Sequence, residues 1–431
     1  MEWVLAEPST DARDGTGRRR LRRHAKGFAW TGFDQALSSV SNVVISLALV
    51  RSGGAEALGI FTVAFAAYLI VLGFLRALLS EPVLTIPVEP TGVPDEAERL
   101  GVTTAVTYLL PASLIIVSVG LLAGGFEIVL IGLVLPLVAL QDFFRYLFFR
   151  RGRPELAALL DGAWVVTSVI GWPLISSRGS ISVALVFWAT GGALGVVIGF
   201  AVTKVRFGPI RRSLAWWWRE IRPLGGFLAL SGIVFMLFTQ IMILGLAAIL
   251  GTADLGTLRS VQIVLGPVGI ALTAFTVFAL PRLSTSNARH NMRLAWLASG
   301  GAVALAATST VVLLLLAPVL VPLLFGEELE VPRLLVLAVG VRTTLRALPM
   351  GPTLMLKARR RGAPIAMGLI AGGVVGVPVV LFVAARFGLV PAVWASNVGT
   401  LVNLLVLLLA LRTTARLDSG SGRSAQASGA R

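Results

Sequence analysis

Two arginines in the interior of a long apolar run are the residues of this sequence best suited to binding chemistry. Arg342 and Arg346 stand four residues apart in LLVLAVGVRTTLRALPMGP, so a helix brings them to one face. At 1.5 Å per residue, Arg342 would lie about 15 Å from the start of that helix. A guanidinium keeps its charge at physiological pH and binds phosphate oxygens through paired hydrogen bonds. The pair therefore predicts either ion pairs with acids elsewhere in the chain or a hydrated cavity that receives an anion.

The acids of the sequence are distributed unevenly around this pair. Between residues 223 and 412 they all lie between apolar runs: Asp254, Glu327, Glu328 and Glu330. The first half instead carries charges of both signs inside its apolar runs: Asp34, Arg76, Asp142, Arg145 and Asp161. Asp142 and Arg145 are three residues apart and can meet on one helix face. Pairing among these charges would close one side of the molecule, whereas unpaired charges would face a cavity.

The first apolar run, FAWTGFDQALSSVSNVVISLAL, is unusually polar. It places a stripe of hydrophilic side chains and their neighbours on one helix: Asp34, Gln35, Ser38, Ser39, Ser41 and Asn42. A helix surrounded by lipid would not carry this stripe. We expect it to line a cavity, to bind a proton or a sodium ion through Asp34, or to form hydrogen bonds with neighbouring helices.

The composition indicates which elements position these residues. Of the 431 residues, 56% are hydrophobic and 13% are charged, whereas a soluble domain carries roughly 25% charged residues. The chain therefore belongs in a membrane, and its continuous apolar runs favour helices over strands. The absence of cysteine excludes disulfides, thiol nucleophiles and cysteine metal sites. His24 and His290 lie outside the apolar runs, which excludes a histidine relay within the membrane.

The apolar runs predict twelve membrane-spanning helices. They cover residues 28–50, 57–80, 101–123, 126–148, 155–175, 180–202, 224–250, 256–280, 294–318, 332–355, 364–385 and 389–411. Most of the 37 lysines and arginines fall in alternate connecting segments, which places both termini in the cytoplasm. The expected parts of the chain are a basic tail over 1–27, a bundle over 28–202, an interfacial linker over 203–223, a second bundle over 224–411 and a tail over 412–431.

The net charge of +16 is spread over these short segments, which favours a topological role over nucleic-acid binding. The outer segments hold few basic residues: Arg51, Arg178, Arg259, Arg333 and Arg386. In the linker, three tryptophans stand beside arginines in SLAWWWREIRP and predict a helix lying on the inner leaflet. The sequence has no GxxxxGK[ST] phosphate-binding loop and no connecting segment long enough for a catalytic domain, so neither an ATP-driven pump nor an enzyme is predicted.

Two short phrases occur once in each half. RRGRP, residues 150–154, follows the fourth predicted span, and RRGAP, residues 360–364, follows the tenth. Leu58-Gly59 opens the second span and Leu255-Gly256 opens the eighth. Both pairs relate one span to the span six places later, and an even number of spans keeps the two halves in the same orientation. We therefore predict an all-α membrane fold of two six-helix bundles related by a pseudo-twofold axis along the membrane normal, V-shaped around a central cavity.

Two stretches of the sequence resemble a known family. KGFAWTGFDQALSSVSNVVISLALVRSGGAEALGIFTVAFAAYLIVLGFLRALLSEP (26–82) and LQDFFRYLFFRRGRPELAALLDGAW (140–164) resemble the polysaccharide-type flippases of the multidrug/oligosaccharidyl-lipid/polysaccharide exporter superfamily. The shared features are a polar first helix, Leu-Gly-x-Phe at the start of the second helix and a Gly-Arg-Pro inner loop. The resemblance covers the whole chain in architecture, but its motifs end at Trp164.

The resemblance implies a secondary-type transporter that moves an undecaprenyl-diphosphate-linked oligosaccharide across the bacterial plasma membrane for polysaccharide export, by alternating access. It implies no cofactor other than a coupling H⁺ or Na⁺. The implied partners are the lipid-linked oligosaccharide, membrane lipids, a polysaccharide polymerase and glycosyltransferases, but not nucleic acid. The implied contacts to diphosphate or sugar are Arg76, Arg145, Arg342 and Arg346. The candidates for ion coupling are Asp34, Asp142 and Asp161, and those for the polar cavity lining are Gln35, Ser38 and Asn42.

Two other functions stay open at this point. One is an ion-coupled exporter of drugs or other small molecules with the same fold, and the other is a non-transport membrane protein of envelope assembly. Export of cations favours an acidic cavity, and the second half has no acid within a span. Arginines without partners inside a membrane argue against a purely structural protein.

Overall fold

The computed structural model of the chain describes residues 16–88, 95–178, 180–269, 272, 288–326, 329–358 and 361–428. Within these ranges every regular element is a helix, as the apolar runs predict. The first half consists of α1 (Thr16–Leu75), η1 (Arg76–Ser80), α2 (Glu81–Leu84), α3 (Glu96–Ala123), α4 (Phe126–Arg150), α5 (Pro154–Arg178) and α6 (Ile181–Thr203). The linker contains α7 (Ile210–Trp216) and η2 (Trp217–Ile221), and both η1 and η2 are π-helical turns.

The described helices of the second half follow directly on η2. They are α8 (Arg222–Leu250), α9 (Thr252–Val264), α11 (Ala288–Phe325), α12 (Arg333–Ala347), α13 (Met350–Ala358), α14 (Ala363–Phe387), α15 (Leu389–Ala395) and α16 (Asn397–Ser428). Pro349 separates α12 from α13, because a proline cannot donate the backbone hydrogen bond that would continue the helix.

Ten stretches of the described chain are long and apolar enough to cross a membrane. One of them, Ser39–Leu84, contains the first two predicted spans, because α1 reverses at Gly53 and Gly54. Gly54 has φ +65°, a conformation that glycine adopts at little cost. The predicted span 256–280 begins as α9, but most of its second part lies outside the described residues. Each of the other nine predicted spans corresponds to a helix of the structure.

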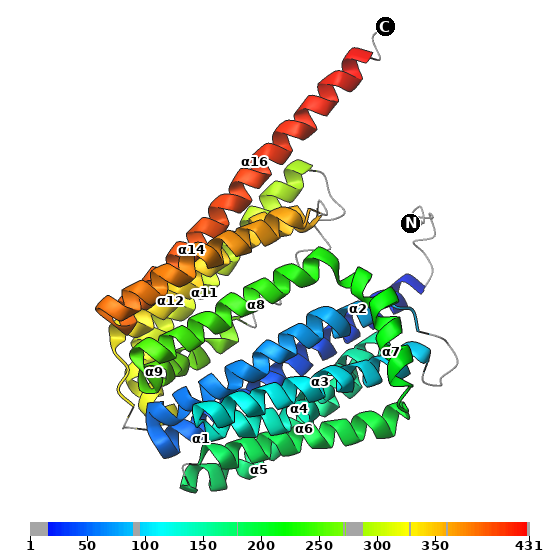
Figure 1. Ribbon diagram of the computed structural model, residues 1–431. Helices are drawn as coiled ribbons and strands as arrows, with labels where there is room; N and C mark the ends of the chain where they lie inside the picture. The colour runs from blue at the N-terminus through cyan, green and yellow to red at the C-terminus, as the bar shows by residue number, and fades with distance from the viewer. Residues whose placement is uncertain are drawn as a thin grey trace.

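The packing of the first half recurs six spans later. In the first half α1 packs on α5, α3 on α4, and α5 on α6; in the second half α8 packs on α14, α11 on α12, and α14 on α16. Figure 1 shows the two sets of helices close together at α1 and α9 and diverging toward the chain ends. The prediction of two repeated helix bundles is therefore confirmed.

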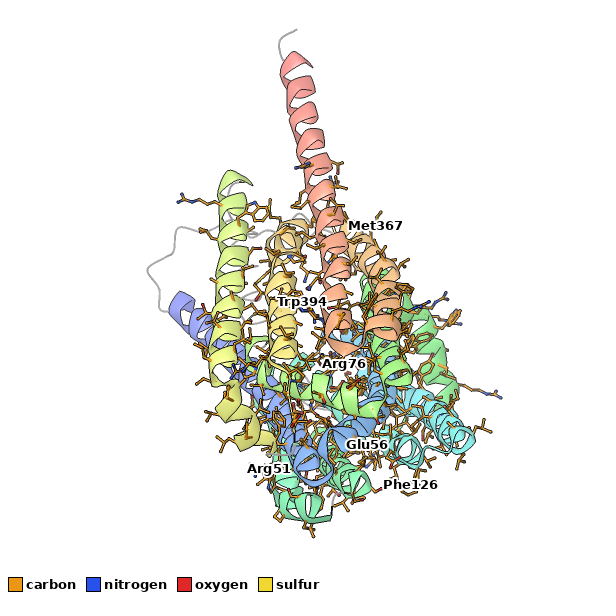
Figure 2. The ribbon with its side chains drawn as sticks, turned by 90° about the vertical axis from the view of Figure 1, so that its left-hand side faces the viewer. Arg51, Glu56, Arg76, Phe126, Met367 and Trp394 are labelled. Atoms are coloured by element: carbon orange, nitrogen blue, oxygen red, sulfur yellow. The ribbon has the colours of Figure 1, made fainter. Side chains whose placement is uncertain are left out.

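The pair of bundles has two faces, at the two ends of its helices (Figure 1). The start of α1 and the end of α16 lie at one face together with α2 and α7, and we call it the terminus face (Figure 1). The reversal of α1 and the start of α9 lie at the other, which we call the opposite face (Figure 1). Figure 2 shows Arg51, Glu56 and Phe126 at the opposite face.

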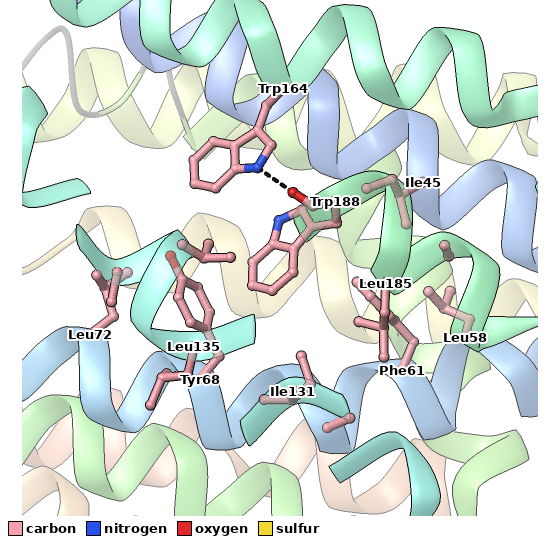
Figure 3. Packing of buried hydrophobic residues seen from close by; sticks show 14 of the residues in the cluster. Ile45, Leu58, Phe61, Tyr68, Leu72, Ile131, Leu135, Trp164, Leu185 and Trp188 are labelled. Carbon is pink, nitrogen blue, oxygen red and sulfur yellow. Dashed lines mark hydrogen bonds between the residues drawn. The ribbon is translucent and has the colours of Figure 1, made fainter. Parts of the chain in front are cut away.

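Aromatic side chains fill the interior of the first half. Trp164 and Trp188 stack with centroids 6.0 Å apart and an interplanar angle of 2°, and Tyr68 meets Trp188 edge-on at 4.8 Å. The indole nitrogen of Trp164 donates to the Trp188 carbonyl oxygen at 2.7 Å (Figure 3). All three side chains are buried, so the centre of this half is a packed core.

The sequence predicts that the linker tryptophans lie at the membrane interface, but only one of the three is exposed in the structure. Trp216 and Trp217 are buried, and only Trp218 is exposed, with the Arg222 guanidinium 4.0 Å from its ring centroid. The Trp217 indole nitrogen donates to the Leu78 carbonyl oxygen at 2.9 Å. That carbonyl lies in η1, where the π-helical turn leaves backbone oxygens without their usual helical partners. The linker is therefore fastened to the end of α1 by packing.

Candidate functional site: an arginine-lined cavity

The charged residues within the first half pair with each other. Arg76 holds Asp142 through two bonds, from Nε to Oδ2 at 2.8 Å and from Nη2 to Oδ1 at 2.6 Å. Arg145 donates to Asp142 at 2.9 Å and lies 3.2 Å from Asp161, to which Gln141 also donates at 3.1 Å. Asp142 and Asp161 are almost completely buried. Among the described residues the group thus contains two positive and two negative charges, and it corresponds to the pairing network that the sequence allowed.

This pairing limits what the first-half charges can do. A cation that binds Asp142 must displace a bidentate arginine, and an anion that binds Arg145 must compete with two buried carboxylates. Arg76 is the most accessible member, with 37% of its side chain exposed (Figure 2). Roles for Arg76 and Arg145 in substrate binding, and for Asp142 and Asp161 in ion coupling, stay predictions.

The second-half arginines have a different environment. Arg342 and Arg346 lie on α12 and line a cavity of about 360 Å³ between the two halves, which we call the central cavity. Its walls come from α1, α8, α9 and α12. Within the described part of the chain neither arginine forms an ion pair, and no carboxylate is found among the residues that line the cavity. Of the two alternatives for this pair, the structure thus favours a cavity over partners in the first half.

A third arginine belongs to the same cavity. Arg259 lies on α9 and lines the central cavity together with Arg342 and Arg346. The sequence analysis assigns Arg259 to an outer segment, and that assignment is wrong because α9 is already helical from Thr252 onward. Its position within the predicted span 256–280 was the available signal. Among the described residues, three arginines and no carboxylate line this cavity, a combination that attracts anions.

The polar neighbours of these arginines are uncharged. Gln240 and Gln262 line the central cavity, and Gln240 is only 4% exposed. Its side-chain oxygen Oε1 has no hydrogen-bond partner within the described residues. Thr62 and Thr343 also line the cavity and donate to backbone carbonyl oxygens at 2.7 and 2.8 Å, which leaves their own oxygens free to accept. Such groups suit the hydroxyl groups and ester oxygens of a neutral polar ligand beside an anion.

A second cavity, which we call the side chamber, lies within the second half. It has a volume of about 400 Å³ and is lined mainly by residues of α8, α12, α14 and α16. Arg342 and Arg346 line this chamber as well, together with Thr239 and Met242, which also line the central cavity. The two spaces therefore meet at the arginine pair.

The two halves meet closely at the opposite face, through the second phrase of the repeat. A Cβ atom placed on Gly59 would lie 1.7 Å from the Thr252 carbonyl oxygen, and one placed on Gly256 would lie 1.7 Å from the Ala55 carbonyl oxygen. Each glycine thus faces the residue four positions before its counterpart, which is the reciprocal contact expected across a pseudo-twofold axis. The helices α1 and α9 can approach this closely only because both positions lack a side chain.

A side chain strengthens that contact at its edge. Arg51, just before the reversal of α1, donates to the backbone carbonyl oxygens of Leu323 and Leu324, with a distance of 3.0 Å for the latter. These carbonyls end α11, where the helix dipole favours a positive charge. The central cavity is thus closed at the opposite face by backbone packing and by this arginine cap.

No protein-family model and no curated protein matches the sequence. Solved structures match it over most of its length. The lipid II flippase MurJ in an inward closed conformation has a TM-score of 0.65 at 13% identity, with 89% of this chain and 87% of that chain covered. An inward-facing multidrug resistance MATE family transporter of the MOP superfamily has a TM-score of 0.61 at 16% identity, with 88% and 94% covered.

A third similar structure is a MOP superfamily transporter from Pyrococcus furiosus, at a TM-score of 0.52 and 16% identity, with 91% and 95% covered. Its description reports a binding pocket of reverse polarity. The chain has the fold of the MOP superfamily transporters. At these identities the likeness concerns the fold, and the neighbours are transporters and a flippase, not enzymes.

Within this MOP fold the RRGRP and RRGAP phrases lie at the turns that precede α5 and α14, with a shift of two residues between the phrases. The backbone nitrogen of Arg153 bonds to the Phe148 carbonyl oxygen at 2.9 Å, and that of Arg361 bonds to the Leu356 carbonyl oxygen at 2.8 Å. Both bonds span five residues and both precede a proline-started helix. The phrases are therefore structural corners of the two bundles.

The arginines of the first corner are used for packing. Arg150 holds Asp95 through bonds of 3.0 and 2.6 Å, and Arg151 donates to Glu98 at 2.7 Å from its Nε. The hydrogen bonds to Glu98 also raise the pKa of the Arg151 guanidinium. These pairs fasten the end of α4 to the start of α3. Of the second corner, residues 359 and 360 lie outside the described residues.

The polar stripe of the first helix is only partly visible in the MOP fold. The side chains of Asp34, Gln35 and Ser38 lie outside the described part of the chain, although their backbone belongs to α1. Asn42 is half-buried, and its backbone carbonyl accepts a hydrogen bond from Ser46 at 2.7 Å. Ion coupling through Asp34 and cavity lining by Gln35, Ser38 and Asn42 stay predictions.

Proposed function

We propose that this protein is a flippase for a lipid-linked oligosaccharide, with the diphosphate of the carrier bound by Arg342, Arg346 and Arg259. The observation that carries the proposal is a cavity between two repeated bundles that, within the described part of the chain, is lined by three arginines and no carboxylate. A diphosphate offers many oxygens to guanidinium groups, and its charge offsets the cost of burying them. The likeness in fold to a lipid II flippase supports the proposal.

The charge of the cavity weighs against the main alternative, an exporter of cationic drugs. A cationic substrate would meet three guanidinium groups and no described carboxylate on the cavity wall. Like charges placed together in a partly dry site repel each other by several kcal/mol. The likeness to MATE transporters concerns the fold, which hosts more than one polarity of binding pocket.

Transport would proceed by alternating access. The structure has its two halves in contact at the opposite face and diverging toward the terminus face, where the sequence places the cytoplasm (Figure 1). The substrate then enters from the inner leaflet of a bacterial plasma membrane and leaves after the Gly59–Gly256 contact opens. An H⁺ or Na⁺ gradient would drive the cycle, with Asp34 and the pair Asp142 and Asp161 as the candidate ion sites. A glycosyltransferase supplies such a substrate and a polysaccharide polymerase consumes it.

Surface glycan export tests the proposal. A strain that depends on this protein should lose surface polysaccharide and accumulate carrier-linked oligosaccharide when Arg342→Ala and Arg346→Ala are combined. Arg333→Ala is the matched control, because Arg333 begins the same helix, is exposed and does not line the cavity. All variants are compared at equal amounts of membrane-inserted protein. Normal export by the double variant refutes the proposal, and a loss of drug resistance with normal export favours the exporter.

A further inference from the structure

The side chamber differs from the central cavity in the character of its walls. Beyond the shared arginines it is lined by apolar side chains: Phe235, Phe238, Leu369, Val377 and Val380. Its few polar groups, among them Ser396 and Thr400, are uncharged. An apolar space of about 400 Å³ that opens on a pair of guanidinium groups matches a ligand with an anionic head and an apolar chain.

Glycines make this space. A Cβ atom on Gly372 would lie 2.6 Å from the Gly399 carbonyl oxygen, and one on Gly376 would lie 2.8 Å from the Gly399 Cα, so α14 and α16 cross at backbone distance. Gly372, Gly376 and Gly399 all line the chamber. At Gly372 and Gly376 no side chain reaches into the chamber, which is bounded on the side of α8 by Phe235 and Phe238.

The first half has a similar crossing of α5 and α6, where a Cβ atom on Gly191 would lie 2.9 Å from the Trp164 Cα, but there the residue of α5 is a tryptophan. In the register of the turns, which aligns Arg153 with Arg361, Trp164 corresponds to Gly372. Trp164 is buried and stacked on Trp188 in the interior (Figure 3), whereas Gly372 leaves the corresponding position beside the chamber without a side chain. Two halves with the same helices thus differ in the filling of their interiors. A difference of this kind indicates that the chamber is a feature of one half with a function of its own.

We propose that the side chamber holds the polyprenyl chain of the carrier, in the part next to the diphosphate, while the glycan occupies the central cavity. This inference rests on the proposed function and adds to it a second subsite. The diphosphate would lie at Arg342 and Arg346, where the two spaces meet. The protein then binds three parts of the carrier at once: the glycan, the diphosphate and the start of the polyprenyl chain. A free sugar phosphate offers only the sugar and the phosphate.

Competition binding to the purified full chain in detergent tests the inference. The probes are inorganic diphosphate and farnesyl diphosphate, and the measured quantity is the ratio of their dissociation constants. All variants are measured at one detergent concentration, so that partition of the farnesyl chain into micelles affects them equally. Each buried CH₂ tightens binding by about fourfold. We therefore expect farnesyl diphosphate to bind the unaltered protein at least about 100-fold more tightly than inorganic diphosphate.

Filling the chamber should remove only the contribution that the polyprenyl chain makes to the affinity. Val377→Trp and Leu369→Trp place an indole in the chamber, and Val374→Trp is the matched control on the lipid-facing side of α14. The first two variants should lower the ratio to below about tenfold and leave the affinity for inorganic diphosphate within about twofold. The control should keep the ratio of the unaltered protein.

Three results would overturn the inference. The first is an unchanged ratio in both filled variants with normal diphosphate affinity. The second, which does not depend on those variants folding, is crosslinking of a benzophenone-bearing farnesyl diphosphate to the unaltered protein only outside α8, α14 and α16. The third concerns dihexanoyl phosphatidic acid. If it binds more tightly than inorganic phosphate by the same factor that separates farnesyl diphosphate from inorganic diphosphate, and if Val377→Trp removes this factor, the chamber is assigned to acyl chains. Failure of inorganic diphosphate to bind the unaltered protein would instead refute the proposed function.

Discussion

The contact between Gly59 and the backbone of α9 allows a direct test of the alternating-access argument. In Gly59→Ala the new Cβ atom would lie 1.7 Å from the Thr252 carbonyl oxygen, a distance that packed structures do not show. The helices α1 and α9 must therefore move apart by more than about 1 Å, and such overpacking costs about 1–3 kcal/mol. The cost falls only on states in which the halves touch at the opposite face. The equilibrium should shift about 5- to 150-fold toward states that are open there.

The chain offers a clean assay because it contains no cysteine. A single cysteine at Thr62, which lines the central cavity and is 8% exposed, reports on access from the opposite face. In membrane vesicles, the rate of labelling by an impermeant maleimide on that side should rise in Gly59→Ala in proportion to the open population. Gly256→Ala should give the same result, because a Cβ atom there meets the Ala55 carbonyl oxygen at the same distance.

Gly376→Ala is the matched control for the labelling experiment. Its Cβ atom would lie 2.8 Å from the Gly399 Cα, so the overpacking occurs within the second half and not between the halves. We expect a lower midpoint of thermal unfolding and an unchanged labelling rate at Thr62→Cys. If Gly59→Ala and Gly256→Ala label no faster than this control, the contact between the glycines does not close the cavity, and the reasoning is wrong.

Three further predictions concern named side chains. Arg51→Ala removes the cap on the last carbonyls of α11 and should raise the same labelling rate roughly twofold to tenfold, as expected for a lost hydrogen bond; an unchanged rate would contradict the cap. Asp142→Asn removes the negative partner of a buried guanidinium and should destabilise the protein by about 3–5 kcal/mol in reversible unfolding, with part of the loss recovered when Arg76→Gln is added; a loss below 1 kcal/mol would mean that water already solvates the pair. Arg259→Gln should impair glycan export as Arg342→Ala does, measured beside Arg333→Ala, and normal export would remove Arg259 from the substrate site.

Much of the fold could be predicted from the sequence, because membrane insertion is governed by local properties. The length of apolar runs gives the helices, and the alternation of basic segments gives their order and number. The repeated phrases predict two bundles in parallel orientation, and the recurring helix packing of the two halves confirms the two bundles. Hydrophobic length and loop charge act on each segment separately, so no knowledge of neighbours is needed.

The roles of the charged residues could be predicted only as alternatives. Arg76 and Arg342 are both arginines within predicted spans, yet Arg76 is paired with Asp142 and Arg342 has no ion-pair partner among the described residues. Periodicity places Asp142 and Arg145 on one face but says nothing of which other helix faces them. Arg259 lies near the start of the predicted span 256–280, and the sequence does not show that its side chain faces the central cavity. Pairing depends on which helices touch, and that is decided only when the bundle packs.

The sequence by itself determined that this protein is a bundle of membrane helices with a repeat and with arginines that need either a partner or an anion. Tertiary packing decided which of these arginines are satisfied. It joined Gly59 to the backbone of α9, enclosed Arg342 and Arg346 between two cavities, and left the second half with an open interior where the first half is packed with tryptophan. The physical reason is that cavities and ion pairs are properties of contacts between helices distant in sequence, and no local pattern encodes them.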